Sequence, residues 1–118
     1  MTNPPTTAPL PLHVPREMRV WSYRSSHRTL VFRGFWESAD TTVTEVECVS
    51  VVAMKTGPVY RGLTIREAPH DPEIAQLVDG PEPLSPRYHR LQLLSDGQPA
   101  GFVVCGDVRL HESPVDQW

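Results

Sequence analysis

Apolar and polar residues alternate along most of this chain with the period of two that is typical of β-strands. Residues 19–36 contain two such runs, of which the second, from Thr29, alternates more clearly, and the two flank the polar, turn-tolerant residues 24–27. In the second run, Leu30, Phe32 and Trp36 share one face of the predicted strand. Residues 19–36 are therefore predicted to form a β-hairpin whose apolar side begins the hydrophobic core.

The first strand of this hairpin alternates imperfectly. Trp21 and Tyr23 are expected on one face of it, with Val20 and Ser22 on the other. Because so small a domain needs its aromatic residues for the core, we expect these two aromatic side chains to be packed inside.

Four further strands follow from the same pattern. Residues 42–54 are the longest run rich in β-branched side chains, which makes a helix unattractive there. Residues 59–66, 87–94 and 101–112 complete the set, and the last two runs are separated by an Asp-Gly turn, a recognised hairpin signal. The chain is thus predicted to hold about six strands, mostly joined by short turns.

One stretch has the signals of a helix. Asp71 is an N-cap candidate, Pro72 would occupy the first helical position and Gly80 would end the helix. One short helix, at about residues 71–79, cannot cover a broad sheet. The predicted fold is therefore mainly β: a small antiparallel β-sandwich or a curled, barrel-like sheet of about six strands, with an open sheet covered by the helix as the alternative.

The chain has 118 residues, the size of one ordinary domain. Five of its 13 prolines fall within the first fifteen residues, among largely small or polar neighbours that do not form a helix or pack a core. We expect residues 1–15 to be a Pro-rich flexible tail, residues 16–113 a single β-rich domain and residues 114–118 a short C-terminal tail.

The sequence shows neither the pattern of a signal peptide nor a run of eighteen apolar residues. A cytoplasmic protein that does not span a membrane is the expectation. Cys48 and Cys105 both lie in apolar, strand-like runs, where a free cysteine usually behaves as a small buried hydrophobe. We therefore expect both thiols to be reduced and buried.

Charge is distributed unevenly along the chain. The net charge of −3 disfavours a general nucleic-acid binder, which usually carries a basic surplus. Residues 16–34 hold five arginines and one acid, whereas residues 37–47 hold four acids and no base. If these segments form adjacent strands, their charges can pair across the sheet. A functional basic patch is the alternative.

The most distinctive polar cluster lies at the tip of the predicted hairpin. Arg24, His27 and Arg28 would gather there, and two guanidinium groups on one tip can receive a carboxylate or a phosphate. Arg33 is expected on the outer face of the same hairpin. These four residues are the candidate binding site, and a solvated turn is the alternative interpretation.

The sequence holds no recognised catalytic or cofactor motif. The five histidines are scattered without the spacing of metal ligands, and no phosphate-cradling glycine pattern occurs. Ser25 and Ser26 stand beside His27, but turn residues of a hairpin explain them more simply than a nucleophile does. No catalytic residue, metal or cofactor is therefore assigned, and an enzyme is the less favoured interpretation.

Three classes of function remain open. The first, which we favour, is a small, cytosolic, non-enzymatic protein-interaction domain of bacterial type, such as an immunity or inhibitor protein or an accessory subunit. The second is a small-ligand-binding β-barrel or small barrel enzyme, with a cavity lined by polar groups such as Arg33, Arg61, His89 or Asp107. The third is a nucleic-acid-associated domain that uses the arginine-rich hairpin. A homodimer formed through an unpaired edge strand is a further expectation.

Overall fold

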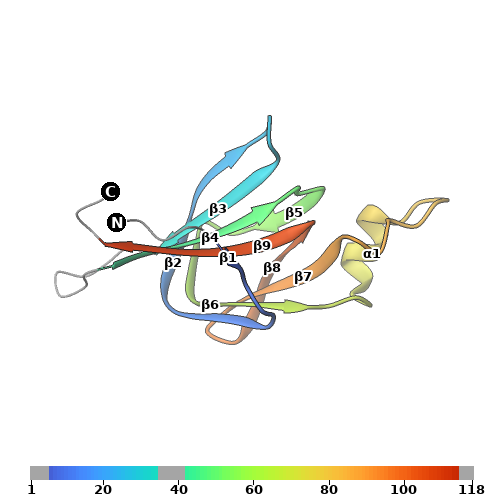
Figure 1. Cartoon of the computed structure of the whole chain (residues 1–118). Coiled ribbons are helices and arrows are strands. Elements are labelled where there is room, and N and C mark those ends of the chain that lie inside the picture. The colour runs from blue at the N-terminus through green and yellow to red at the C-terminus, as the bar shows by residue number, and fades with distance from the viewer. Residues whose placement is uncertain (1–5, 35–41, 115–118) are drawn as a thin grey trace.

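Nine β-strands and one short helix make up the structure, a computed structural model that describes residues 6–34 and 42–114 (Figure 1). All strand pairs are antiparallel, so the prediction of a mainly β protein with one short helix is confirmed. The elements are β1 (Thr6–Thr7), β2 (Leu12–Arg24), β3 (Thr29–Gly34), β4 (Thr42–Val49), β5 (Ala53–Thr56), β6 (Val59–Glu67), α1 (Pro72–Val78), β7 (His89–Ser95), β8 (Gln98–Cys105) and β9 (Asp107–Pro114).

The strands form one open sheet in the order β1-β9-β4-β3-β2-β6-β7-β8-β5. Side chains from strands that are far apart in this order share a single core, for example Val103 of β8 and Val108 of β9. A flat sheet cannot bring such strands together on one face. The sheet is therefore curled around its core, and α1 lies at one end of it (Figure 1).

Two of the predicted strands are each divided by a bend. Residues 42–54 break at Ser50, which has a φ of 58°, and residues 101–112 break at Gly106. The two bends lie side by side, because the Gly106 N–H donates to the Val49 carbonyl at 2.8 Å. Together with β1, these two bends raise the number of strands from the predicted six to nine.

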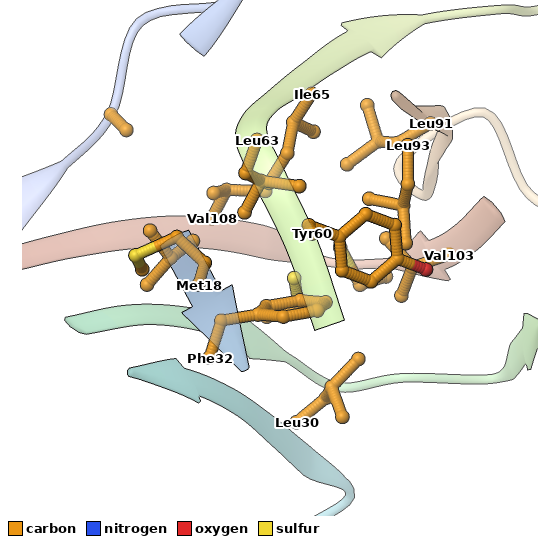
Figure 2. Packing of buried hydrophobic residues seen from close by; sticks show 14 of the residues in the cluster. Met18, Leu30, Phe32, Tyr60, Leu63, Ile65, Leu91, Leu93, Val103 and Val108 are labelled. Carbon is orange, nitrogen blue, oxygen red and sulfur yellow. The ribbon is translucent and has the colours of Figure 1, made fainter. Parts of the chain in front are cut away.

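Two aromatic side chains from the strands that flank β2 occupy the centre of the core. Phe32 of β3 and Tyr60 of β6 are fully buried and meet edge to face, with ring centroids 5.7 Å apart (Figure 2). The Tyr60 hydroxyl accepts from the Gly57 N–H and donates to the Ala100 carbonyl, both at 3.0 Å. The one polar atom of this aromatic pair is thus fully bonded.

The expectation of a flexible tail is wrong for residues 6–15. β1 pairs with β9, β2 begins at Leu12, and both Ala8 and Val14 are buried. The prolines are tolerated because they avoid the regular ladder: Pro15, for instance, lies where the pairing of β2 with β6 is interrupted. This segment therefore belongs to the folded domain.

Some of the predictions concern residues outside the described ranges. Trp36, expected in the core, is one of these, and so are residues 1–5 and 115–118 of the two expected tails. Pro114, the first residue of the expected C-terminal tail, is the last residue of β9.

The prediction that Trp21 and Tyr23 share one face of the strand is wrong, because β2 contains a β-bulge. Trp21 is an extra residue between two paired positions, Val20 and Ser22. The bulge brings Ser22 to the face of Trp21, whereas Tyr23 pairs with the buried Leu30 and lies on the opposite face. Trp21 and Tyr23 are 48% and 41% exposed, so the expected packing of both in the core is wrong.

Helix α1 begins as predicted. The Asp71 side chain accepts from the backbone N–H groups of Glu73 at 2.8 Å and of Ile74 at 3.3 Å, and Pro72 is the first helical residue. Ile74 is fully buried in a second, smaller cluster that includes Phe102 of β8. The helix thus covers the side of β8 that faces away from the main core.

Cys48 and Cys105 are both free and fully buried, as predicted. Their side chains also meet, and the hydrogen bond to Cys105 together with burial raises the pKa of the Cys48 thiol well above its ordinary value. Because the thiolate is the reactive form, this shift makes Cys48 a poor nucleophile.

Replacing Tyr60 by phenylalanine should destabilise the fold even though the ring is kept. The change leaves the Gly57 N–H and the Ala100 carbonyl without their partner, at a cost of about 1–3 kcal/mol. Urea unfolding measures this cost. Phe32→Ala, which removes a whole ring from the core, should cost more, about 3–5 kcal/mol. A Tyr60→Phe protein as stable as the wild type would contradict this account of the hydroxyl.

The same variant gives a test by pH. Burial raises the pKa of Tyr60, although the Gly57 hydrogen bond acts in the opposite direction. A raised pKa in the folded state means that the neutral hydroxyl contributes fully below about pH 10, the ordinary tyrosine value, and that its contribution is lost above it. The difference in unfolding free energy between wild type and Tyr60→Phe should therefore shrink as the pH rises beyond about 10.

Candidate functional site

An open pocket of about 450 Å³ lies on the outer face of the sheet, where β2, β3 and β4 run side by side. The alternation of β3 accounts for its position, because Val31 and Arg33 face the pocket while Leu30 and Phe32 enter the core. The pocket is lined by Trp21, Ser22, Arg24, His27, Thr29, Val31, Arg33, Glu45 and Glu47.

An ion pair between neighbouring strands forms the most buried part of this pocket. Arg33 of β3 lies opposite Glu45 of β4, and its guanidinium donates to Glu45 Oε2 from Nε at 2.9 Å and from Nη2 at 2.7 Å. The Arg33 Cζ also lies 4.1 Å from the centroid of the Trp21 ring, a cation–π contact. The predicted pairing of the arginine-rich and acidic segments is confirmed at this position.

Two residues of β9 extend the network beyond the pocket. His111 Nδ1 lies 3.8 Å from Glu45 Oε1, and a hydrogen bond of 3.0 Å joins His111 Nε2 to the Ser113 hydroxyl. The sheet register explains the arrangement, because Glu45 lies opposite His111 and Ser113 follows on the same face two residues later. Glu45 and Ser113 are both buried.

Ser113, His111 and Glu45 are the residue types of a serine-hydrolase catalytic group, but their geometry is unsuited to that chemistry. Ser113 retains only 1% exposure, so a substrate carbonyl does not reach its Oγ. The distance between His111 and Glu45 exceeds hydrogen-bond length, and Glu45 is already bonded to Arg33. We interpret the three residues as a structural network that satisfies buried polar groups.

Three of the four predicted binding residues meet at the pocket. Arg24 and His27 are exposed at its rim, and Arg33 lies inside it. Arg28 is the exception: its backbone is left-handed, with a φ of 49°, and it does not line the pocket. Of the two arginines at the hairpin tip, Arg24 therefore lines the pocket and Arg28 does not.

Charges of both signs remain unpaired around the pocket. Within residues 6–34 and 42–114, the side chains of Arg24 and His27 have no hydrogen-bond or ion-pair partner, and Glu47 forms no ion pair. Sequence reasoning missed Glu47 and Trp21 as site residues. Glu47 becomes one because the register places it opposite Val31, and Trp21 because of the bulge.

The other polar residues considered for a ligand cavity do not join Arg33. His89 Nδ1 lies 2.8 Å from Glu67 Oε1, and Asp107 pairs with Arg109 at 3.1 Å. Arg61 lines a separate surface depression. Of the four candidates for a ligand cavity, only Arg33 lines the pocket on β2, β3 and β4.

Neither a metal cluster nor a membrane-spanning helix is found in the described part of the chain. No three His, Cys, Asp or Glu side chains within those ranges could together hold a metal ion. No helix there has the length and apolar character that a membrane span requires. Comparisons of the sequence and the structure with models of protein families, with curated proteins and with solved structures found no match.

Breaking the buried ion pair of the pocket should be costly from either side. Arg33→Ala or Glu45→Ala alone leaves the other charge poorly solvated and should lower the unfolding free energy by about 2–4 kcal/mol. This loss is slightly smaller than for a fully buried pair, because the Arg33 side chain keeps 19% exposure. The double variant should cost less than the sum of the two, with a coupling of about 1–3 kcal/mol in urea unfolding. Arg19→Ala and Glu17→Ala, which break an exposed pair, should show a coupling of about 0–1 kcal/mol and serve as the matched control. Equal coupling in both pairs would refute the distinction.

Ser113 should not react as an activated nucleophile. A fluorophosphonate probe should leave it unlabelled under conditions that label a known serine hydrolase, because its Oγ is buried. Ser113→Ala should cost only about 0.5–1.5 kcal/mol of unfolding free energy, the value of one hydrogen bond. Labelling of Ser113 that His111→Ala abolishes would overturn the structural interpretation.

Proposed function

We propose that this chain is a small, non-enzymatic protein-interaction domain, such as an immunity or inhibitor protein or an accessory subunit, and that the pocket on β2, β3 and β4 receives a loop of its partner. The observation that carries this proposal is the exposure of Trp21 and Arg24 beside unpaired charges of both signs. A cytoplasmic location goes with the proposal and is equally open to test.

The residue types at the pocket support a protein partner. Tryptophan and arginine are enriched among the residues that carry most of the binding energy in protein interfaces. Trp21 is 48% exposed, and Arg24 follows it on the same strand. In the free protein, the exposed indole leaves apolar surface in contact with water. A partner that covers the ring removes this surface from water, which contributes favourably to the free energy of binding.

The charges indicate what the partner presents. Arg24 and His27 suit an acidic side chain, whereas Glu47 suits a basic side chain or another hydrogen-bond donor. The Arg33–Glu45 pair between them is already satisfied, so it supports the shape of the pocket and adds no unpaired charge. We therefore propose a partner loop with charges of both signs.

The sheet edges suit a partner less well than the pocket does. In the described part of the sheet, the edge strands are β1 and β5, which are two and four residues long. Short edge strands are one of the ways in which proteins avoid pairing through their edges. A homodimer through an edge strand is therefore the less favoured arrangement.

Binding of a small polar molecule is the second candidate, because the pocket volume of about 450 Å³ lies within the range of ligand sites. Native mass spectrometry of protein purified from its host distinguishes the two candidates. A bound small molecule that Arg24→Ala loses would favour this alternative. Nucleic acid is disfavoured because two carboxylates, Glu45 and Glu47, line the same pocket.

Affinity capture from the native host, repeated with variants, tests the proposal. The wild type should retain one stoichiometric protein, and Trp21→Ala and Arg24→Ala should each weaken its binding by about 30-fold or more, as expected for central interface residues. Arg61→Ala removes an exposed guanidinium elsewhere on the surface and should change the affinity by less than about twofold. Equal urea midpoints would show that all four proteins are folded.

Two outcomes would contradict the proposal. A partner that binds Trp21→Ala and Arg24→Ala as tightly as wild type would place the interface elsewhere. Salt-sensitive binding of RNA or DNA that Arg24→Ala abolishes would instead favour a nucleic-acid-associated domain.

A further inference from the structure

A groove with mostly apolar walls lies between the edge strand β5 and helix α1. One part of it has a volume of about 360 Å³ and is lined by Met54, Leu77 and Phe102 together with Lys55, Glu73 and Gln76. A second part, of about 420 Å³, is lined by Val52 and Val78 among others, and again by Met54 and Leu77. Because these last two residues line both parts, the groove is continuous, and we call it the β5–α1 groove.

Large apolar side chains of this groove are left in contact with water. Six large apolar side chains are exposed in the described part of the chain, and three of them line the groove. Leu77 is 61% exposed, and Val52 and Met54 are each 37% exposed. Single exposed apolar residues are ordinary on protein surfaces, whereas neighbouring ones around a depression are typical of a contact surface. The β5–α1 groove is therefore a candidate contact surface.

The orientation of the short helix explains why Leu77 is not buried. Ile74 enters the small apolar cluster with Phe102, whereas Leu77 lies one turn after Glu73 and so shares the helix face of that residue. This face is turned towards β5, because Glu73 Oε2 accepts from Lys55 Nζ at 2.9 Å. Leu77 therefore lies on the wall of the groove and not beneath the helix.

The charges of the groove suit a surface that meets a copy of itself. Among the described residues that line it, only Lys55 and Glu73 are charged, and both side chains are more than half exposed. In a two-fold dimer the same surface occurs on both copies, so a patch of a single sign would repel its counterpart. A patch with one cation and one anion can instead pair Lys55 of each copy with Glu73 of the other.

We propose that two copies of this chain form a symmetric dimer in which their β5–α1 grooves face each other and Leu77 of each copy enters the groove of the other. Burial of Leu77 and Met54 contributes the favourable free energy, and the exchanged pairs of Lys55 with Glu73 fix the orientation. Side chains make this contact, so it does not require the four-residue strand β5 to pair with its copy. A contact made by one short helix and one short strand is small, so the dimer should dissociate on dilution.

The dimer does not depend on the protein-interaction proposal. No residue that lines the β5–α1 groove also lines the pocket on β2, β3 and β4. Arg24→Ala should therefore dimerise as the wild type does, although it should weaken the binding of a protein partner at the pocket. Failure of either proposal leaves the other in place.

Sedimentation velocity of the full chain over a range of concentrations tests the dimer. The wild type should change reversibly from monomer to dimer as the concentration rises. Leu77→Ser should weaken dimerisation by about 100-fold or more, because each dimer loses two apolar side chains from its contact. Val59→Ser changes an exposed apolar residue that does not line the groove, and it should dimerise within about twofold of wild type. Leu77→Ser should keep the wild-type urea midpoint, because this side chain is already exposed.

Charge reversal tests whether the two grooves face each other. Lys55→Glu gives the groove two negative charges and Glu73→Lys gives it two positive charges, so each variant alone should dimerise about tenfold more weakly than the wild type. An equimolar mixture should form the heterodimer of the two variants and recover the wild-type affinity to within about threefold. Mixing would restore nothing if the copies met through another surface.

Three outcomes would overturn the proposal. The first is a wild type that stays monomeric at the highest attainable concentration; if a protein from the host then covers the groove in a manner that depends on Leu77, the surface belongs to that protein. The second is a dimer that Leu77→Ser leaves unchanged. The third is a mixture of Lys55→Glu and Glu73→Lys that forms no heterodimer.

Discussion

The fold depends on two neighbouring strand pairs that bend at the same point. The hydrogen bond from Gly106 to Val49 ties the bend between β8 and β9 to the bend between β4 and β5. Within residues 6–34 and 42–114, α1 is only seven residues long and no second layer covers the inner face of the sheet, so the sheet must curl to bury it. The shared core of Val103 from β8 and Val108 from β9, two strands that are far apart in the sheet order, is a consequence of that curl.

The same curl leaves the outer face of β2, β3 and β4 to solvent, and this face is organised by charge. A buried charge without a partner is unfavourable, and in this pocket the charges of Arg33 and Glu45 pair with each other. The Trp21 ring also contacts the Arg33 guanidinium, and His111 lies near the second carboxylate oxygen of Glu45. The part of the pocket below its rim is therefore stabilised by side chains whose charges are already paired. Arg24, at the rim, is available to a partner because nothing in the described part of the chain engages its side chain.

Only part of the β2–β3 hairpin tip belongs to the pocket. The turn at residues 25–28 reverses the chain, and Arg24 and His27 line the pocket whereas Arg28, whose backbone is left-handed, does not. A turn is well suited to this arrangement, because residues on a turn do not have to alternate between the two faces of a sheet.

Local patterns by themselves determined much of the architecture. Alternation of apolar residues predicted β3, β6 and β7, and the capping residue Asp71 predicted the start of α1, because each signal lies within one element. The sequence also predicted that Arg24, His27 and Arg33 lie close together, because all three belong to one hairpin.

The tertiary structure alone decided the rest. The bulge at Trp21 decides which residues of β2 line the pocket, and the pairing of β4 with β9 places His111 beside Glu45, a residue far from it in the chain. A shift of one residue in strand pairing moves every following side chain to the other face. Which pairing is adopted depends on how the whole core packs, and no local stretch of sequence contains that information.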